Sequence, residues 1–414
     1  MRKIYLMLLA VCLAAVVNAQ VTVAGASAGN GSYTTLGAAF TAIATATGTI
    51  TIDISGNTTE ATGGMTLAAG TWTSITIAPT GGPWTISGAA TAGTPLITFN
   101  GSDNVTINGG DNLILTNTTA SATSGTSTLK LQADATNNTF NNTTFLGSAI
   151  PTSGGTNAAN IWISTGTSTG NDNNAFQSCK FGPAGTNLPS QLFVANGSTT
   201  STAIENSNVT VNNCEFYNYF IASGTQSAMY VALGNTNWNI TNNKIYQTAT
   251  RTITTSSTVY GIYCVNAGAT ALGENFTITG NIIGYNNNSG TGTMTYEAGT
   301  TIGGFIGILF NHSATSTGTS NINTNIVSNI QWTSTSSSLF TGISSTSLAS
   351  TTVGNTLNMN SNQVKNITSV TATGQITGIL AGYSPAVSVS SNIIDNITRS
   401  GAGVFYGIQY SGTT

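Results

Sequence analysis

The chain has 414 residues, of which only 5% are charged, whereas about 25% is usual in globular domains. A hydrophobic fraction of 39% argues against a disordered, low-complexity chain, because it supplies enough apolar material for a core. The formal net charge of −3, with eight Lys plus Arg, excludes the basic surface that nucleic acid or an anionic membrane would require.

The N-terminus predicts a secretory signal peptide over residues 1–19. Two basic residues precede an apolar run from Ile4 to Val17, and the small residue Ala19 completes a cleavage site before Gln20. No later apolar stretch approaches the roughly 20 residues that a membrane span requires. We therefore expect an exported chain, secreted or held at the outer cell surface, with no membrane span.

The segment "YTTLGAAFTAI" at 33–43 has helical spacing. A threonine precedes it as a cap, and four apolar residues recur on one helical face. These residues are Leu36, Ala39, Phe40 and Ile43. We expect a short helix that, together with neighbouring strands, caps the N-terminal end of an all-β body over about residues 30–55.

Beyond the cap, short runs of alternating apolar residues between Gly, Asn, Ser and Thr clusters predict β-strands. One stretch recurs, as in "VNNCEF", "ITNNKI" and "VSSNII", within a repeat region that we place at about residues 56–412. Its recurring position is occupied by Thr143, Cys179, Cys214, Asn243, Asn281, Asn325, Asn362 and Asn392. An apolar residue follows two positions later in every copy, and a second strand lies between consecutive copies. Each repeat therefore carries at least two strands at corresponding places.

The repeats step by 29 to 44 residues while their strands keep their places. A β-propeller blade needs about 40–50 residues and four strands, whereas a parallel β-helix stacks each strand on its copy at ~4.8 Å and lets extra residues bulge out. Asparagine tolerates left-handed φ at the turn between strands, and its amide can hydrogen-bond its equivalent one coil away. We therefore predict an all-β fold, a single right-handed parallel β-helix over residues 20–414.

The runs "ITNNKI", "ITGNII", "MNSNQV" and "VSSNII", with cysteine in "VNNCEF" and "FQSCKF", resemble the right-handed parallel β-helix repeat of pectin-lyase-like proteins. The resemblance covers roughly residues 30 to 412 and includes the amphipathic N-terminal cap. It implies the fold far more than the activity, because enzymes, adhesins and passive stalks share this scaffold.

The signal peptide and the Asn/Thr/Gly-rich body are also similar to large cell-surface proteins of Bacteroidota that the type IX system exports. The C-terminal sorting domain of those proteins does not follow the last repeat strand, at residues 405–409. We therefore expect the chain to be a fragment with an open C-terminal end, continued by further repeats or another domain in a longer protein.

Charged residues are few and dispersed. Enzymes of this family that cleave polyuronates have clustered Asp residues, and glycosidases need two carboxylates at about 5–9.5 Å; this chain has eleven acids and no Asp-Asp pair. The register stacks Lys180, Glu215 and Lys244 with alternating sign in three successive coils. Lys365 and Asp395 stack likewise, which indicates a structural role for these charges.

Two further acids and the only histidine give no clear catalytic pattern. Asp103 and Asp111 either meet in a turn or make separate Asx turns. His312 begins a loop after a core strand and has no second ligand at metal-binding spacing, so we expect no metal and no cofactor.

Three cysteines follow the signal peptide. Cys179 and Cys214 stand one coil apart, so a disulfide and a buried pair of thiols are both compatible with the strand spacing. Cys264 is expected to fill the core.

One long loop, at residues 285–301, carries side chains suited to a sugar. Tyr285, Tyr296 and Glu297 can stack on and hydrogen-bond a carbohydrate, and a plain polar surface loop is the alternative. We predict a non-enzymatic, adhesin-like surface module that binds polysaccharide or another cell surface. The alternative is a polysaccharide lyase or glycoside hydrolase whose acids converge from different coils.

Overall fold

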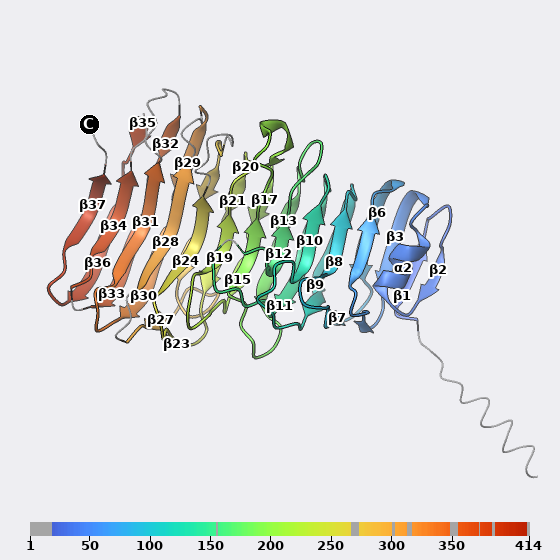
Figure 1. Cartoon of the computed structure of the whole chain (residues 1–414), viewed down its shortest axis with the longest axis horizontal. Coiled ribbons are helices and arrows are strands. Elements are labelled where there is room, and N and C mark those ends of the chain that lie inside the picture. Colours follow the sequence, from blue (N-terminus) through green and yellow to red (C-terminus); the bar gives the residue numbers. More distant parts are fainter. Residues whose placement is uncertain are drawn as a thin grey trace, which may run out of the picture.

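The computed structural model describes residues 19–154, 156–265, 273–299, 303–312, 317–347, 355–371, 373–382 and 386–411. The predicted signal peptide lies outside these residues, apart from its last residue, Ala19. No helix in the described part is long and apolar enough to cross a membrane. As predicted, the fold is an all-β parallel solenoid, of about ten turns, and Figure 1 shows it as one elongated body.

The N-terminal end is closed by an antiparallel unit and one helix. β1 (Val21–Ala24) pairs antiparallel with β2 (Gly31–Tyr33) and with β3 (Thr47–Ile54). The helix α2 (Leu36–Ala42) begins after Thr35, whose hydroxyl accepts a hydrogen bond from the Ala38 N–H at 3.1 Å. All four apolar residues of the predicted helical face are buried, so the expected cap is confirmed.

Three β-faces follow, and one of them is an eleven-stranded parallel sheet with a single strand per coil. Its strands are β5 (Met65–Ala68), β8 (Pro95–Asn100), β10 (Ser127–Gln132), β12 (Ala159–Ile163), β15 (Gln191–Ala195), β19 (Gln226–Val231), β24 (Ser257–Val265), β28 (Gly303–His312), β31 (Leu339–Ser347), β34 (Ile376–Gly382) and β37 (Phe405–Ser411). We call it the single-strand sheet.

The other two faces belong to one sheet that bends at a turn inside each coil. The strands before the bend are β6 (Thr71–Pro79), β13 (Ala175–Gln177), β17 (Thr210–Asn212), β21 (Asn239–Thr241), β25 (Thr277–Thr279), β29 (Thr319–Asn323), β32 (Thr356–Asn358) and β35 (Ala386–Ser388). The strands after it are β4 (Thr58–Thr59), β7 (Trp84–Gly88), β14 (Lys180–Pro183), β18 (Glu215–Tyr217), β22 (Lys244–Tyr246), β23 (Arg251–Thr252), β26 (Ile282–Gly284), β27 (Met294–Glu297), β30 (Ile326–Thr333), β33 (Gln363–Val370) and β36 (Ile393–Ser400). β9 (Val105–Asn117) and β11 (Thr139–Gly147) cross the bend, while β16 (Asn206–Ser207), β20 (Asn235–Thr236) and the 3₁₀ turn η1 (Thr202–Ile204) lie elsewhere in the coils.

The core is a set of inward columns in the predicted register. Phe145, Phe181 and Phe216 are paired coil on coil, with ring centroids 5.6 Å and then 4.7 Å apart and the rings stacked. The column continues through Ile245, Ile283, Val327, Val364 and Ile394. Each inward side chain is thus buried mainly by its equivalents above and below.

A glycine column in the single-strand sheet lets the two sheets approach closely. A Cβ on Gly307 would lie 2.5 Å from the carbonyl oxygen of Gly342 and 2.8 Å from Cγ2 of Val327. Equivalent contacts surround Gly261, Gly342 and Gly378. Gly407, in the last described coil, has nothing within 4 Å of such a Cβ. Apolar side chains of that coil are correspondingly exposed, since in a solenoid each coil is covered only by its neighbours.

The left-handed turn position differs from the one we expected. The residue before each recurring Thr, Cys or Asn has positive φ, and the recurring residue itself does not. The left-handed residues are Asn142, Ser178, Asn213, Asn242, Gly280, Thr324, Ser361 and Ser391. The recurring side chain is therefore free to turn inward, because its neighbour makes the bend.

The recurring residues form a buried column of hydrogen bonds. Asn243 Nδ2 donates to Asn281 Oδ1 at 2.9 Å, and the backbone N–H of Asn243 donates to the same oxygen at 3.1 Å. Asn281, Asn325 and Asn362 repeat this pattern toward Asn392. Cys179 and Cys214 continue the column as free, buried thiols.

Candidate functional site

Most acids serve neighbouring coils and do not form a catalytic cluster. The buried Glu60 carboxylate accepts hydrogen bonds from the N–H groups of Leu36 and Gly37, at 2.9 and 3.0 Å, at the start of α2. Asp172 accepts from Ser207 N–H at 2.7 Å, and Glu274 accepts from Gly318 N–H at 2.8 Å. Each carboxylate fastens one coil to the next. Burial raises the pKa of Asp172, and the charge of the nearby Asp134 raises it further.

Asp134 is the most strongly held of these carboxylates. It accepts hydrogen bonds from the backbone N–H groups of residues 167–170, between 2.8 and 3.1 Å. Burial by itself raises the pKa of Asp134, but these bonds and one from the Thr167 hydroxyl more than offset it and hold the pKa well below its usual range. The carboxylate therefore stays ionised and fastens one loop to the next coil.

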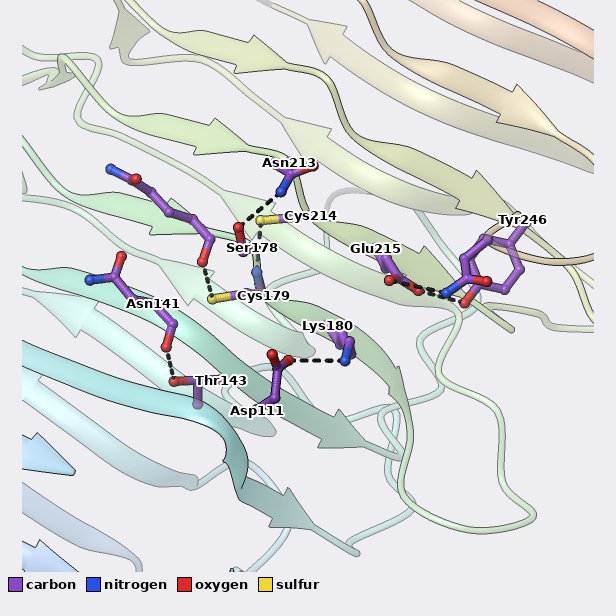
Figure 2. A network of polar contacts seen from close by, with 12 residues as sticks. Asp111, Asn141, Thr143, Ser178, Cys179, Lys180, Asn213, Cys214, Glu215 and Tyr246 are labelled. Carbon is purple, nitrogen blue, oxygen red and sulfur yellow. Dashed lines mark hydrogen bonds and ion pairs between the residues drawn. The ribbon is translucent and has the colours of Figure 1, made fainter. Parts of the chain in front are cut away.

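The charged column over the bent sheet has the predicted register. Lys180 pairs with Glu215, and Glu215 with Lys244, on adjacent strands. The ion pair is different from the one expected: among the described residues, the salt bridge joins Lys180 Nζ to Asp111 Oδ1 at 3.0 Å (Figure 2). Lys180 reaches past β11 to β9, so Asp111 does not meet Asp103, whose carboxylate accepts from Thr136 N–H at 2.7 Å.

Glu215 and Lys244 are engaged on the other side of the column. The hydroxyl of Tyr246 donates to Glu215 Oε2 at 2.9 Å (Figure 2). Asn288 Nδ2 donates to Glu215 Oε1 at 3.3 Å. Lys244 Nζ donates to the backbone oxygen of Asn288 at 2.9 Å. These contacts fix the loop that begins at Tyr285 over the outer face of β18 and β22.

Two hollows on this face have Lys244 in both of their linings, and we describe them together as one groove. Its lining includes Asp111, Asn142, Ser178, Lys180, Asn213, Glu215, Lys244, Tyr246, Tyr285, Asn287, Asn288 and Ser289. We call it the charged groove. It runs across β11, β14, β18, β22 and β26, so successive strands contribute polar groups at steps of ~4.8 Å.

Tyr285 stands out by its backbone. Its φ is 65°, a left-handed conformation that is rare and strained for a bulky residue. The equivalent position one coil further holds Asn329, with φ 55°, and in later coils Asn366 and Asn396, with φ 54° and 49°. An aromatic side chain thus stands where later coils have asparagine. Of the three predicted sugar contacts, Tyr285 is the one that lines the charged groove.

A second aromatic element lies beside it. The rings of Tyr217 and Tyr246 are stacked, with centroids 5.8 Å apart and planes at 14°. Burial raises the pKa of the Tyr246 hydroxyl, and the Glu215 carboxylate raises it further. Tyr246 therefore remains a hydrogen-bond donor to Glu215 throughout the physiological range of pH.

The two carboxylates of the charged groove come from different coils and have different partners. Asp111 and Glu215 stand on strands separated by three steps of the sheet. Asp111 binds Lys180, and Glu215 binds Tyr246 on the coil beyond it. Both carboxylates are thus already engaged by groups of the protein itself.

The other two predicted sugar contacts are not in the groove. The prediction for Tyr296 was wrong, because this residue is fully buried. Its ring packs on those of Trp332 and Phe305, with centroids 5.7 and 6.0 Å away. The expected loop turns into β27, whose alternation buries Met294 and Tyr296 and exposes Glu297. The alternation in "MTYE" was the signal that sequence reasoning missed. Glu297 pairs with Thr252 and Thr333 on neighbouring strands.

Within the described part of the chain, neither His312 nor a cluster of metal ligands lines the charged groove. His312 is the last residue of β28 and not the start of a loop, and its side chain lies outside the described part. Among the described residues, no three His, Cys, Asp or Glu side chains are close enough to hold a metal ion.

No protein-family model matches the sequence, and no curated protein matches it either. Among solved structures, it is similar to PfbA, a surface adhesin of Streptococcus pneumoniae, at 13% identity and a TM-score of 0.41, covering 88% of this chain and 84% of that one. It is also similar to the catalytic domain of a GH87 alpha-1,3-glucanase, at 12% identity and a TM-score of 0.34, covering 92% of this chain and 66% of that one.

Proposed function

We propose that the chain is an exported, adhesin-like surface module that binds polysaccharide in the charged groove without cleaving it. The observation that carries the proposal is Tyr285, a strained aromatic residue that lines the charged groove at a position where later coils carry asparagine. Strained residues cluster at ligand sites because function, and not stability, maintains them.

The concentration of charge supports the same site. The chain has 19 charged Lys, Arg, Asp and Glu residues, eight basic plus eleven acidic, and four of them line the charged groove. Amides and hydroxyls line the same groove, together with the ring of Tyr285. An aromatic ring and hydrogen-bonding groups in one groove suit a sugar, which presents C–H faces and hydroxyls.

The alternative function is a polysaccharide lyase or glycoside hydrolase, since Asp111 and Glu215 line the same groove. Their engagement with Lys180 and Tyr246 favours binding over cleavage.

An array of immobilised polysaccharides tests the proposal. The purified chain is applied to the array, and each spot is read for retained protein and for new reducing or unsaturated ends. Retention without new ends is the expected result. New reducing or unsaturated ends on any spot would favour the enzymatic alternative over the binding module. An array that retains no protein would contradict the proposed function.

A further inference from the structure

The four charges of the charged groove cancel. Asp111 and Glu215 are negative and Lys180 and Lys244 are positive, so the lining carries no net charge. Each is also engaged within the protein: Lys180 with Asp111 at 3.0 Å, Glu215 with Tyr246 at 2.9 Å, and Lys244 with the Asn288 carbonyl at 2.9 Å.

Each lysine of the groove also has an acid beside it. Lys180 forms an ion pair with Asp111, and Lys244, which donates to a carbonyl oxygen, pairs in register with Glu215 on the adjacent strand. A uronate carboxylate would therefore have to compete with Asp111 for Lys180, or approach Glu215 in order to reach Lys244. A neutral sugar hydroxyl, in contrast, can donate to the outer oxygens and accept from the amides while leaving these pairs intact.

The lining is also periodic along the solenoid. Asn142, Ser178 and Asn213 occupy the same left-handed turn position in successive coils, and Asn213 Nδ2 donates to the Ser178 hydroxyl at 2.9 Å. A repeating surface of this kind suits a linear polymer lying across the strands. The strands beneath the groove already pair on both sides, so an extended peptide cannot be added as a further strand.

We infer that the ligand of the charged groove is an uncharged, linear polysaccharide bound along the solenoid axis. This inference rests on the proposed function and adds the substrate class. It makes the Asp111–Lys180 pair a specificity element, because Asp111 keeps Lys180 from attracting polyuronates.

The test compares neutral glucans and mannans with polygalacturonate and alginate by affinity electrophoresis, at about 0.02 and about 0.5 M salt. The wild-type chain should bind a neutral polysaccharide with less than about a twofold change in affinity between the two salts. Asp111→Asn frees Lys180 and should raise the affinity for polyuronates at least about fivefold at low salt, with the gain lost at high salt.

Asp395→Asn removes the same charge from an exposed residue of the last described coil, outside the groove, and should change neither affinity. Circular dichroism confirms that each variant is folded. A wild-type chain that prefers polyuronates would overturn the inference and leave the proposed function standing, as would an Asp111→Asn chain without the gain. A chain that binds none of these polysaccharides would remove both.

Discussion

The backbone N–H of Cys214 donates to Oδ1 of Asn243 at 2.9 Å, so a cysteine and an asparagine occupy equivalent places in one buried column. The Cys214 thiol donates to the Phe176 carbonyl, as Asn243 Nδ2 donates to the Val211 carbonyl. Cysteine fits because its sulfur both donates and accepts weakly. The N–H and the thiol of Cys214 thus both have partners in the neighbouring coils.

Removing one amide from this column should destabilise two coils. Asn243→Ala leaves the buried Cys214 N–H without its acceptor and removes a second donor from the Val211 carbonyl. We expect it to lower the free energy of unfolding by about 2 kcal/mol. Asn239→Ala, at an exposed position on the strand before the turn, should change it by no more than about 0.5 kcal/mol. Urea unfolding followed by circular dichroism measures both, and equal effects would contradict the role of the column.

The glycine column predicts a contrast between two coils. Gly307→Ala places a Cβ against the Gly342 carbonyl and Val327, so it should cost about 1–3 kcal/mol. Gly407→Ala, in the same column of the last described coil, meets nothing within 4 Å and should be close to neutral. Thermal unfolding of the two variants decides the matter. A neutral Gly307→Ala would show that the sheets are not held this close.

Tyr285 predicts opposite effects on stability and binding. Tyr285→Asn relieves a bulky left-handed residue, and we expect it to raise the free energy of unfolding by about 1 kcal/mol. The same change should weaken polysaccharide retention, because a ring at the groove is lost. The matched control is Asn329→Gln, one coil away on the same column. Loss of stability in Tyr285→Asn would remove the argument from strain.

Asp134 predicts part of the pH dependence. Its pKa in the folded chain is below the unfolded value, so its contribution is present above about pH 4 and is lost as pH falls through the folded pKa. Asp134→Asn should lower stability at pH 7 and flatten the loss of stability below about pH 4. Acid titrations of both chains, followed by circular dichroism, give the comparison. Parallel acid transitions would show that Asp134 contributes nothing to folding.

The register of the coils was predictable because "ITNNKI"-type runs mark one turn per coil and the apolar residue two positions on must face inward. The sequence also held a second buried column that we did not read: Asn171 Nδ2 donates to Asn206 Oδ1 at 3.0 Å, and Asn206 Nδ2 to Asn235 Oδ1 at 3.2 Å. Their steps of 35 and 29 residues equal those from Cys179 to Cys214 to Asn243, and this was the available signal.

The charged groove was less predictable. Stacking fixes which residues share a column, but long side chains choose partners beyond the adjacent coil, as Lys180 does in reaching Asp111. The loop that starts at Tyr285 comes to lie over Glu215 through the contacts of Asn288, a residue with no repeat equivalent. Such contacts depend on loop conformation, about which strand spacing carries no information.

Hydrogen exchange with a bound polysaccharide tests the central claim most directly. The polysaccharide retained most strongly on the array is added at saturation, and exchange is compared with that of the free chain. We predict slower exchange confined to the exposed loop at residues 286–292 and to the turns at residues 178 and 213, with the distant loop at residues 167–170 unchanged. Protection elsewhere, with none in the charged groove, would contradict the account.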